Sequence, residues 1–252
     1  MATTSSTDVT ICSTEAPYSW NGGSYSATGT YTFSTTNAAG CDSTATLNLT
    51  INNCSTTLNV KAFLEGFYTG SGAMSATLYD LGLSTNSNET DSIEVNLWSA
   101  SDLSNATPNF SSKVVIHTDG TATVVFPGAT LGNSYYVAIK HRNSVETWSA
   151  APVAFSASVS YDFSTGTNKA YDDGVNPSMK QVGSGVYAIY GGDVNQDGGV
   201  DGFDSQIAEN DASNFEFGYN SSDCNGDGSS DAFDAQIIEN NGALFIFSAR
   251  PY

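Results

Sequence analysis

The chain has 252 residues and a formal net charge of −19, because 26 acidic residues outnumber 7 Lys and Arg residues. This charge repels phosphate backbones and anionic lipid, and it argues against nucleic acid as a partner. No apolar run approaches the roughly 18 residues that a membrane-spanning helix needs, which argues against membrane insertion. Only 13% of the residues are charged, and the abundant Ser, Thr, Asn and Gly favour strands and turns over long helices.

Residues 1–53 show the period-two alternation of strands, with a turn sequence at Asn21-Gly22. We interpret this segment as a small Ig-like β unit. Cys12 and Cys41 are candidates for a disulfide, which would stabilise the unit by roughly 2–4 kcal/mol. The four cysteines lie in no CxxC pairing, so an oxidising compartment fits them best, and three connectivities are open. No secretory signal precedes Thr3, and we interpret the start as that of a cleaved fragment.

The alternation continues through residues 54–190 and predicts a β-sandwich, although the same spacing is compatible with a barrel. The clearest predicted hairpin joins residues 114–118 to residues 121–126. Its turn is Asp119-Gly120, a pair that readily adopts the positive φ angles of a two-residue turn. The fold class is therefore mainly β up to residue 190.

Residues 191–252 differ from the rest, because they hold 12 acidic residues and a single Arg. The acidic residues recur in two copies thirty positions apart, at residues 193–204 and 223–234, and each copy is followed by a similar segment. This pattern is an internal duplication. It predicts a third domain, a small α-helical module.

The spacing within each copy is that of a loop that wraps a hard cation in oxygen ligands. Such loops supply ligands from positions 1, 3, 5, 7, 9 and 12, and position 6 is a Gly that permits a sharp turn. Gly198 and Gly228 occupy position 6, and an Asp expected to begin a helix occupies position 12. The sequence therefore predicts two calcium ions rather than magnesium.

With Asp at position 12 and a tandem arrangement, the two loops resemble dockerin-type calcium repeats. The resemblance implies two loop–helix units in near two-fold symmetry, and a non-catalytic role in joining a secreted protein to a partner, such as a cohesin-like protein. It assigns as metal ligands Asp193, Asn195, Asp197, Gly199 through its carbonyl, Asp201 and Asp204, then Asp223, Asn225, Asp227, Ser229 through its carbonyl, Asp231 and Asp234.

The preceding residues resemble the surface proteins that gliding bacteria export by type IX secretion. Residues 17–22, 26–31 and 39–49 are similar to their Ig-like repeats. Residues 64–68, 138–143 and 147–149 are similar to the β region near their C-terminal ends. This resemblance implies an extracellular or cell-surface location. It does not imply a defined activity.

Candidates for catalysis are few, because the chain has 2 His residues and no Gly-x-Ser-x-Gly or His-Glu-x-x-His motif. His141, Arg142 and Trp148 form a polar and aromatic cluster that could contact a sugar or a peptide. We favour a strand end with Trp148 in the core and Arg142 beside an acidic residue. We therefore expect a protein that is not an enzyme.

Two further pairs of residues are candidates for surface roles. Phe203 and Phe233 occupy equivalent positions in the two copies and could form a docking stripe, but we expect them to pack between the repeats. Ser43 and Ser92 lie in short Asp-Ser sequences similar to the O-glycan acceptor sites of such surface proteins.

Three hypotheses on function follow. The first is a non-catalytic, calcium-stabilised structural or adhesive protein outside the cell, which self-associates into a filament or binds another extracellular protein. The second is a binding module, with carbohydrate on the sandwich or a cohesin-like protein on the calcium repeats. The third is a hydrolase of surface glycans, for which the sequence proposes no pair of carboxylates.

Overall fold

The computed structural model describes residues 2–251, apart from the side chain of Ala129. The chain forms two compact units. The first comprises Met1–Thr56 and Pro127–Leu131, and the second comprises Thr57–Phe126 and Gly132–Tyr252. Strands predominate up to Ala188, which confirms the mainly β fold class.

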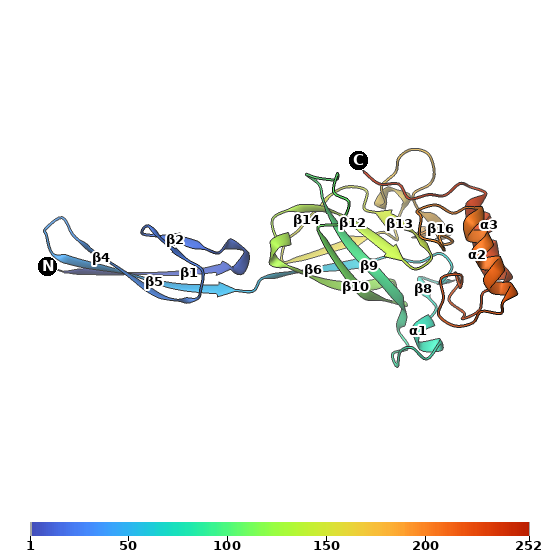
Figure 1. Cartoon of the computed structure of the whole chain (residues 1–252), viewed down its shortest axis with the longest axis horizontal. Helices are drawn as coiled ribbons and strands as arrows, with labels where there is room; N and C mark the ends of the chain where they lie inside the picture. Colours follow the sequence, from blue (N-terminus) through green and yellow to red (C-terminus); the bar gives the residue numbers. More distant parts are fainter. Residues whose placement is uncertain (1, 252) are drawn as a thin grey trace. The chain divides into compact units, whose positions relative to one another are not determined.

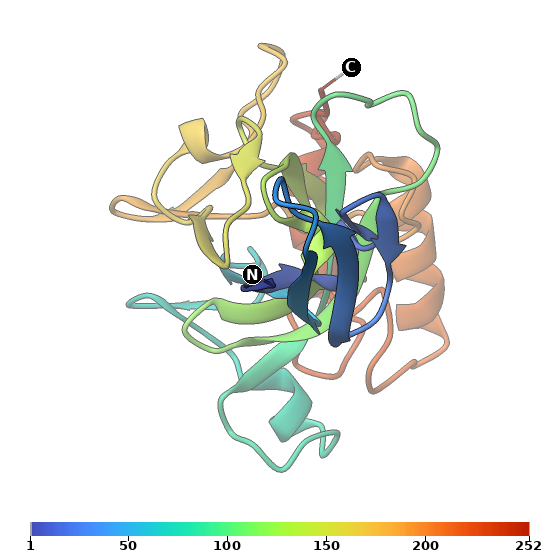
Figure 2. The same cartoon turned by 90° about the vertical axis from the view of Figure 1, so that its left-hand side faces the viewer.

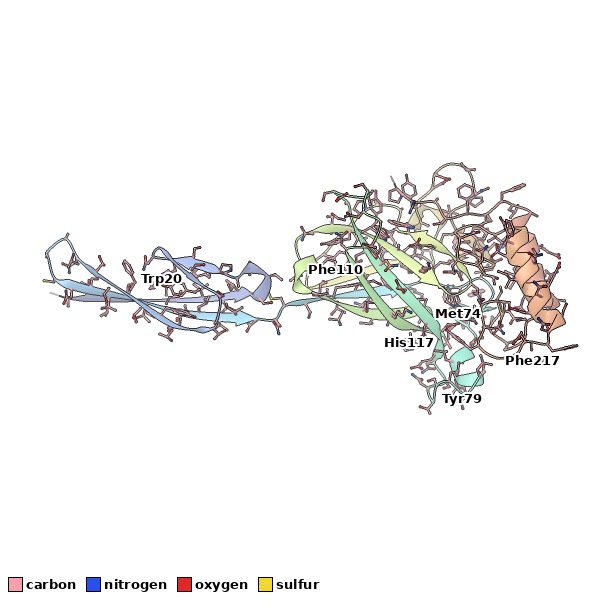
Figure 3. All side chains as sticks on the ribbon, viewed as in Figure 1. Trp20, Met74, Tyr79, Phe110, His117 and Phe217 are labelled. Atoms are coloured by element: carbon pink, nitrogen blue, oxygen red, sulfur yellow. A yellow bond between two sulfur atoms is a disulfide. The ribbon has the colours of Figure 1, made fainter. Side chains whose placement is uncertain are left out.

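A three-stranded sheet in the order β1-β5-β4 forms the first unit. The central strand β5 (Asp42–Asn52) pairs in parallel with β1 (Thr3–Cys12) and antiparallel with β4 (Gly29–Thr36). A short hairpin of β2 (Tyr18–Trp20) and β3 (Gly23–Tyr25) turns at the predicted position. Trp20, labelled in Figure 3, contacts Tyr25 and Phe33.

The disulfide of this unit joins Cys12 to Cys54, so the predicted pairing of Cys12 with Cys41 is wrong. The parallel register explains the difference. Cys12 lies opposite Asn52 at the end of β5, which brings Cys54 within reach, with a Cα–Cα distance of 5.4 Å. Cys41 precedes β5 at its other end, where its backbone N–H donates to the side chain of Asn37.

Two sheets that face each other form the core of the second unit, so the prediction of β-sandwich character is confirmed (Figure 1). The five-stranded sheet has the order β10-β9-β12-β13, and β14 also pairs with β12. Its strands are β9 (Glu89–Ser99), β10 (Phe110–His117), β12 (Ser134–His141), β13 (Ser144–Trp148) and β14 (Val153–Ala154). The three-stranded sheet has the order β11-β6-β15, from β6 (Ser55–Lys61), β11 (Thr121–Pro127) and β15 (Ser158–Asp162).

Alternating side chains of the two sheets make the core, as the period-two pattern predicts. Every second residue of β11 is buried, and β6 buries Leu58 and Val60 in the same way. From the facing sheet, Ile93, Val95 and Leu97 of β9 are buried in the same cluster. The opposite face of β9 is therefore left for other contacts.

The predicted hairpin through Asp119-Gly120 is wrong, because β10 and β11 lie in different sheets. Gly120 has the positive φ that the turn requires, +82°. However, the turn carries the chain from one sheet to the other. A Cβ on Gly120 would lie 2.6 Å from the carbonyl oxygen of Ala62, the residue after β6, so this close approach requires Gly here.

Short elements surround the sandwich. The segment with α1 (Thr77–Asp80) projects from it in both views (Figures 1 and 2). The remaining short strands are β7 (Tyr68–Gly70), β8 (Ala73–Met74), β16 (Lys180–Gly183) and β17 (Val186–Ala188). Single 3-10 turns occur at Ser13–Glu15, Gly128–Thr130 and Thr167–Lys169.

The acidic C-terminal segment belongs to the second unit together with the sandwich. Its helices α2 (Gly202–Ser213) and α3 (Ala232–Gly242) lie side by side (Figure 1). A second hydrophobic cluster joins this segment to the sandwich, because it combines Ile238 and Cys224 with Val145 and Tyr190. The duplicated loops are thus packed against the β-strands.

Candidate functional site

We call residues 193–204 loop I and residues 223–234 loop II. The carboxylate at position 12 closes each loop. In loop I, Oδ1 of Asp204 accepts hydrogen bonds from the N–H groups of Val194 and Asn195, at 2.8 and 3.1 Å. Its Oδ2 accepts one from Asp201 at 2.9 Å. The equivalent contacts recur in loop II, where Asp234 accepts from Cys224, Asn225 and Asp231.

The helix that follows each loop begins earlier than predicted. Asp201, at position 9, is the N-cap of α2, and its Oδ1 accepts a hydrogen bond from the Phe203 N–H at 2.8 Å. Asp231 caps α3 in the same way. The Asp at position 12 therefore lies in the first turn of the helix, where a negative charge is favourable, and does not begin the helix.

The two copies also bond to each other reciprocally. Gly199 of loop I forms a β-bridge with Phe247, which follows α3, and Ser229 of loop II forms one with Phe217, which follows α2. Phe215 and Phe245, the residues two positions earlier, share a φ of +54°. The duplication seen in the sequence is therefore also a duplication of backbone geometry.

Loop I contains a buried carboxylate oxygen without a partner. Oδ2 of Asp193 accepts a hydrogen bond from the Gly198 N–H at 3.2 Å, whereas its Oδ1 has no hydrogen-bond partner among the described residues. Burial raises the pKa of Asp193 to about 7, and the negative charges of Asp204 and Asp197 add to this effect. An ionised Asp193 therefore needs a cation.

The donor chemistry of the loops fits calcium. Hard cations of this size take six to eight oxygen ligands, from carboxylates, amide oxygens and backbone carbonyls. Within residues 2–251, no group of three or more His, Cys, Asp or Glu side chains is placed to hold a metal by itself. An ion in loop I would therefore also draw on the side-chain oxygen of Asn195 and the carbonyl oxygen of Gly199.

Loop II differs from loop I, because a guanidinium group lies against its first carboxylate. Nη2 of Arg142 is 3.5 Å from Oδ2 of Asp223. The same carboxylate accepts hydrogen bonds from the N–H groups of Gly226, Asp227 and Gly228. Burial raises the pKa of Asp223, and the positive charge of Arg142 opposes the rise.

Arg142 connects loop II to a buried aspartate of β9 that the sequence did not reveal. Its Nε donates to Oδ2 of Asp91 at 3.0 Å, and its Nη1 donates to the carbonyl oxygen of Asn220. Tyr219 donates its hydroxyl proton to the same aspartate. Burial by itself would raise the pKa of Asp91, but His141, Arg142 and Tyr219 together lower it to about 2.

The structure also joins a hydroxyl, an imidazole and a carboxylate. His141 Nδ1 is 2.9 Å from the Ser144 Oγ, and its Nε2 is 3.2 Å from Asp91 Oδ2. Burial lowers the pKa of His141, although the Asp91 carboxylate opposes this effect. Ser144 is only 2% exposed, so a substrate has no access to its Oγ. We therefore interpret the three residues as a structural network.

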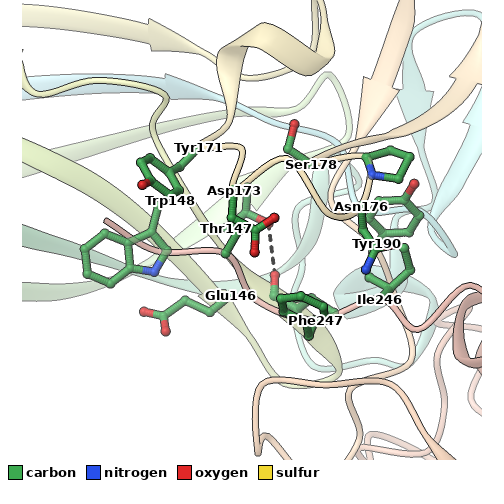
Figure 4. Close-up of a pocket in the computed structure, with 13 residues that line it drawn as sticks. Glu146, Thr147, Trp148, Tyr171, Asp173, Asn176, Ser178, Tyr190, Ile246 and Phe247 are labelled. Atoms are coloured by element: carbon green, nitrogen blue, oxygen red, sulfur yellow. Dashed lines mark hydrogen bonds between the residues drawn. The ribbon is translucent and has the colours of Figure 1, made fainter. Parts of the chain in front are cut away.

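The three residues of the predicted cluster do not lie together: His141 and Arg142 contact Asp91, whereas Trp148 packs against Trp98. Trp148 is 2% exposed, and its ring lies 5.1 Å from that of Trp98. Figure 4 shows it on one side of a pocket that Tyr190 and Ile246 close on the other side. This cavity of about 20 Å³ accommodates one or two water molecules and no sugar ring.

Phe203 and Phe233 do not pack between the repeats, so that prediction is wrong. Each is 67% exposed. The helices turn a different face inward, where Ala208 and Ile238 are buried. Further exposed aromatic residues lie at positions thirty apart, namely Phe215 and Phe245, and Phe217 and Phe247. Figure 3 shows the Phe217 side chain extending away from the ribbon.

The candidate glycan acceptors differ in exposure. Ser43 of β5 is partly buried, and its hydroxyl lies 2.8 Å from that of Thr3. Ser92 of β9 is exposed, and its N–H donates to Oδ1 of Asp91. Glycosylation of either residue stays a prediction.

No protein-family model matches the chain, and no curated protein matches it. Among solved structures, a chain of the type II cohesin–X–dockerin complex from Acetivibrio cellulolyticus, in an N-terminal interface mutant, is similar at 14% sequence identity and a TM-score of 0.41. The match covers 74% of this chain and 94% of that chain. This similarity is too low to assign a fold family or a function. No helix among the described residues is long and apolar enough to cross a membrane.

Proposed function

We propose that the protein is a non-catalytic, calcium-stabilised structural or adhesive module that acts outside the cell. The observation that carries this proposal is the buried Oδ1 of Asp193, which has no hydrogen-bond partner in the described part of the chain. It lies inside a loop whose oxygen donors recur thirty residues later. The proposal includes two calcium ions, one in each loop, and a type IX-secreted surface protein as the parent class. The disulfide between Cys12 and Cys54 supports an oxidising compartment.

Calcium in the loops would stabilise more than the loops themselves. Thr77 donates to the carbonyl oxygen of Gly226 at 2.9 Å, and Asn143 donates to that of Asp223 at 2.7 Å. Both contacts connect loop II to the sandwich. Because metal binding favours the folded state, we propose that its free energy is shared by the whole second unit.

The carboxylates at the first loop positions provide the test of this proposal. In calorimetry, we expect chelator to lower the unfolding temperature of the second unit, because the crowded carboxylates then repel one another. The double variant Asp193→Asn and Asp223→Asn should unfold in calcium at the temperature that the wild-type protein shows in chelator. Asp80→Asn, an exposed position outside both loops, is the matched control. A variant that keeps the full response to calcium would disprove the ligand assignment.

A second candidate function, protein binding through the C-terminal segment, is favoured by the exposed phenylalanines. Large apolar side chains gathered on one segment are typical of interaction sites. Acidic side chains, among them Glu209 and Glu239, are exposed on the same helices, so we propose a partner with basic groups around an apolar patch. The strong negative charge disfavours a second copy.

Sedimentation in millimolar calcium and in chelator separates these two functions. Assemblies that form only with calcium would support a structural polymer. A monomer under both conditions would support the binding module. Replacement of Phe203 and Phe233 by Ser should then abolish binding of the partner without lowering the unfolding temperature, because both side chains are exposed.

A further inference from the structure

Several basic residues of this acidic chain line one pocket. Of the 7 Lys and Arg residues, three line a single pocket on the outer face of the five-stranded sheet. The pocket encloses about 230 Å³, more than ten times the cavity beside Trp148. Its lining residues are Ser92, Ile93, Glu94, Lys113, Lys140, His141, Arg142, Gln196 and Tyr219.

The sheet register explains how the two lysines meet. Glu94 of β9 lies opposite Lys113 of β10 on one side and opposite Lys140 of β12 on the other. Oε1 of Glu94 accepts a hydrogen bond from Ser111 at 2.9 Å. Neither lysine takes part in a salt bridge among the described residues. Two ammonium groups thus flank the Glu94 carboxylate, and the carboxylate of Glu146 on β13 interacts electrostatically with Lys140.

An aromatic ring completes the pocket. The Arg142 guanidinium lies 4.5 Å from the centre of the Tyr219 ring, and the Tyr219 hydroxyl donates to Asp91. The ring is therefore held at its face and at its hydroxyl end. Tyr219 is nevertheless 42% exposed, so apolar ring surface remains open to a ligand.

We propose that this pocket binds a carboxylated sugar, a uronic acid residue of a glycan. The lysines would bind the carboxylate, the Tyr219 ring would contact the C–H face of the sugar, and Gln196 and Ser92 would hydrogen-bond its hydroxyl groups. A long polyanion is disfavoured, because the net charge of the chain repels it at a distance. A single carboxylate within an otherwise neutral sugar avoids most of this repulsion.

The sugar site adds a ligand to the calcium-stabilised module proposed above. It is tested by separate experiments. Glucuronic acid and glucose, as matched probes, are titrated calorimetrically into the full chain in calcium. We expect glucuronic acid to bind at least about tenfold more tightly, the factor that corresponds to one charge-assisted contact. Raising the salt concentration should weaken binding, because Lys113 is exposed.

Two variants test the residues. Lys113→Gln with Lys140→Gln should lower the affinity by about tenfold or more, whereas Lys169→Gln, outside the pocket, should leave it unchanged. Glu94→Gln should raise the affinity, because it removes the negative charge between the lysines. This gain keeps the proposal testable if the double variant fails to fold.

Three results would overturn the proposal: equal affinity for glucuronic acid and glucose, unchanged binding in the folded lysine double variant, or inorganic sulfate that binds as tightly as glucuronic acid. The last result would show a site for a bare anion. The calcium response of the unfolding temperature is measured on the same samples, so a failure of the calcium assignment is recognised independently.

Discussion

Arg142 interacts with carboxylates from two distant segments, Asp91 of β9 and Asp223 of loop II. Arg142 is 51 residues from Asp91 in the sequence, and it is 78 residues from Asn220, whose carbonyl oxygen it also contacts. These separations explain why no local pattern predicts the cluster. The carboxylate spacing within each loop, in contrast, is contained in twelve residues and is visible in the sequence. Chemistry that is local in the chain could be predicted, and chemistry assembled by the fold could not.

Replacing Arg142 by Gln should destabilise the second unit strongly. The change leaves the Asp91 carboxylate, which is fully buried, without its cation, and the loss of one partner of a buried pair costs about 3 kcal/mol or more. Urea unfolding measures the difference. Arg250→Gln, at an exposed position, is the control, and equal stability of the two variants would contradict the role of Arg142.

The raised pKa of Asp193 predicts that stability depends on pH in chelator and that calcium removes the loss of stability at higher pH. In chelator, the pKa of Asp193 in the folded protein is about 7, so it holds a proton up to that pH, whereas the unfolded chain releases the proton near pH 3.8. Stability should therefore fall as the pH rises from 5 to 8. In calcium, stability should not fall over this pH range. Protons compete with the ion for the carboxylates, so calcium binding strengthens as the pH rises.

Unfolding temperatures at these two pH values, with and without chelator, test this expectation. Asp193→Asn removes one titrating group, so the variant in chelator should have a shallower pH dependence. Asp234, whose pKa burial raises to about 6, should account for part of the slope that is left. If the variant shows the same change of unfolding temperature with pH as the wild-type protein, the effect comes from other carboxylates.

At the scale of elements, loop II packs closely against the rest of the second unit at Gly226. Gly226 has a φ of +78°, and a Cβ at this position would lie 2.4 Å from side-chain atoms of Phe67 and Thr77. Gly185 has a similar φ of +70° with nothing within 4 Å of such a Cβ. Both positions require a positive φ, but only Gly226 has side chains of other residues close to it.

Gly185→Ala should therefore cost about 1 kcal/mol, the usual penalty of a left-handed conformation. Gly226→Ala should cost more, because loop II must move away from the side chains of Phe67 and Thr77. Calcium affinity should fall only in the second variant. Equal losses of stability would show that the close packing of loop II contributes nothing.

Strand positions and the loop–helix segments were recognisable from the sequence because their signals repeat within a few residues. Which strands pair with each other in a sheet was not recognisable from the sequence. Asp119-Gly120 is a genuine turn, yet its flanking strands β10 and β11 pair with β9 and β6. Likewise, the parallel pairing of β1 with β5 selects Cys54 as the partner of Cys12, and the order of cysteines in the chain does not reveal this.

At the scale of the whole molecule, the two units should respond to different reagents. The disulfide lies within the first unit, and loops I and II lie within the second. Reduction should therefore destabilise the first unit by roughly 2–4 kcal/mol, whereas chelator should act on the second.

Calorimetry with each reagent alone measures this separation. Cys12→Ser with Cys54→Ser should reproduce the effect of reduction, and Cys41→Ser, outside the disulfide, is the control. A single transition that shifts equally under both reagents would contradict the independence of the units.

The position of the disulfide has a mechanical consequence. A force pulling on β1 passes through the bond from Cys12 to Cys54 directly into β6, which begins at Ser55, so residues 13–53 carry no load. Strand β6 is the central strand of its sheet and pairs in parallel with β15. Tension along β6 therefore loads its hydrogen bonds in shear, so that they must break together, and the molecule should resist stretching better than its thermal stability alone suggests.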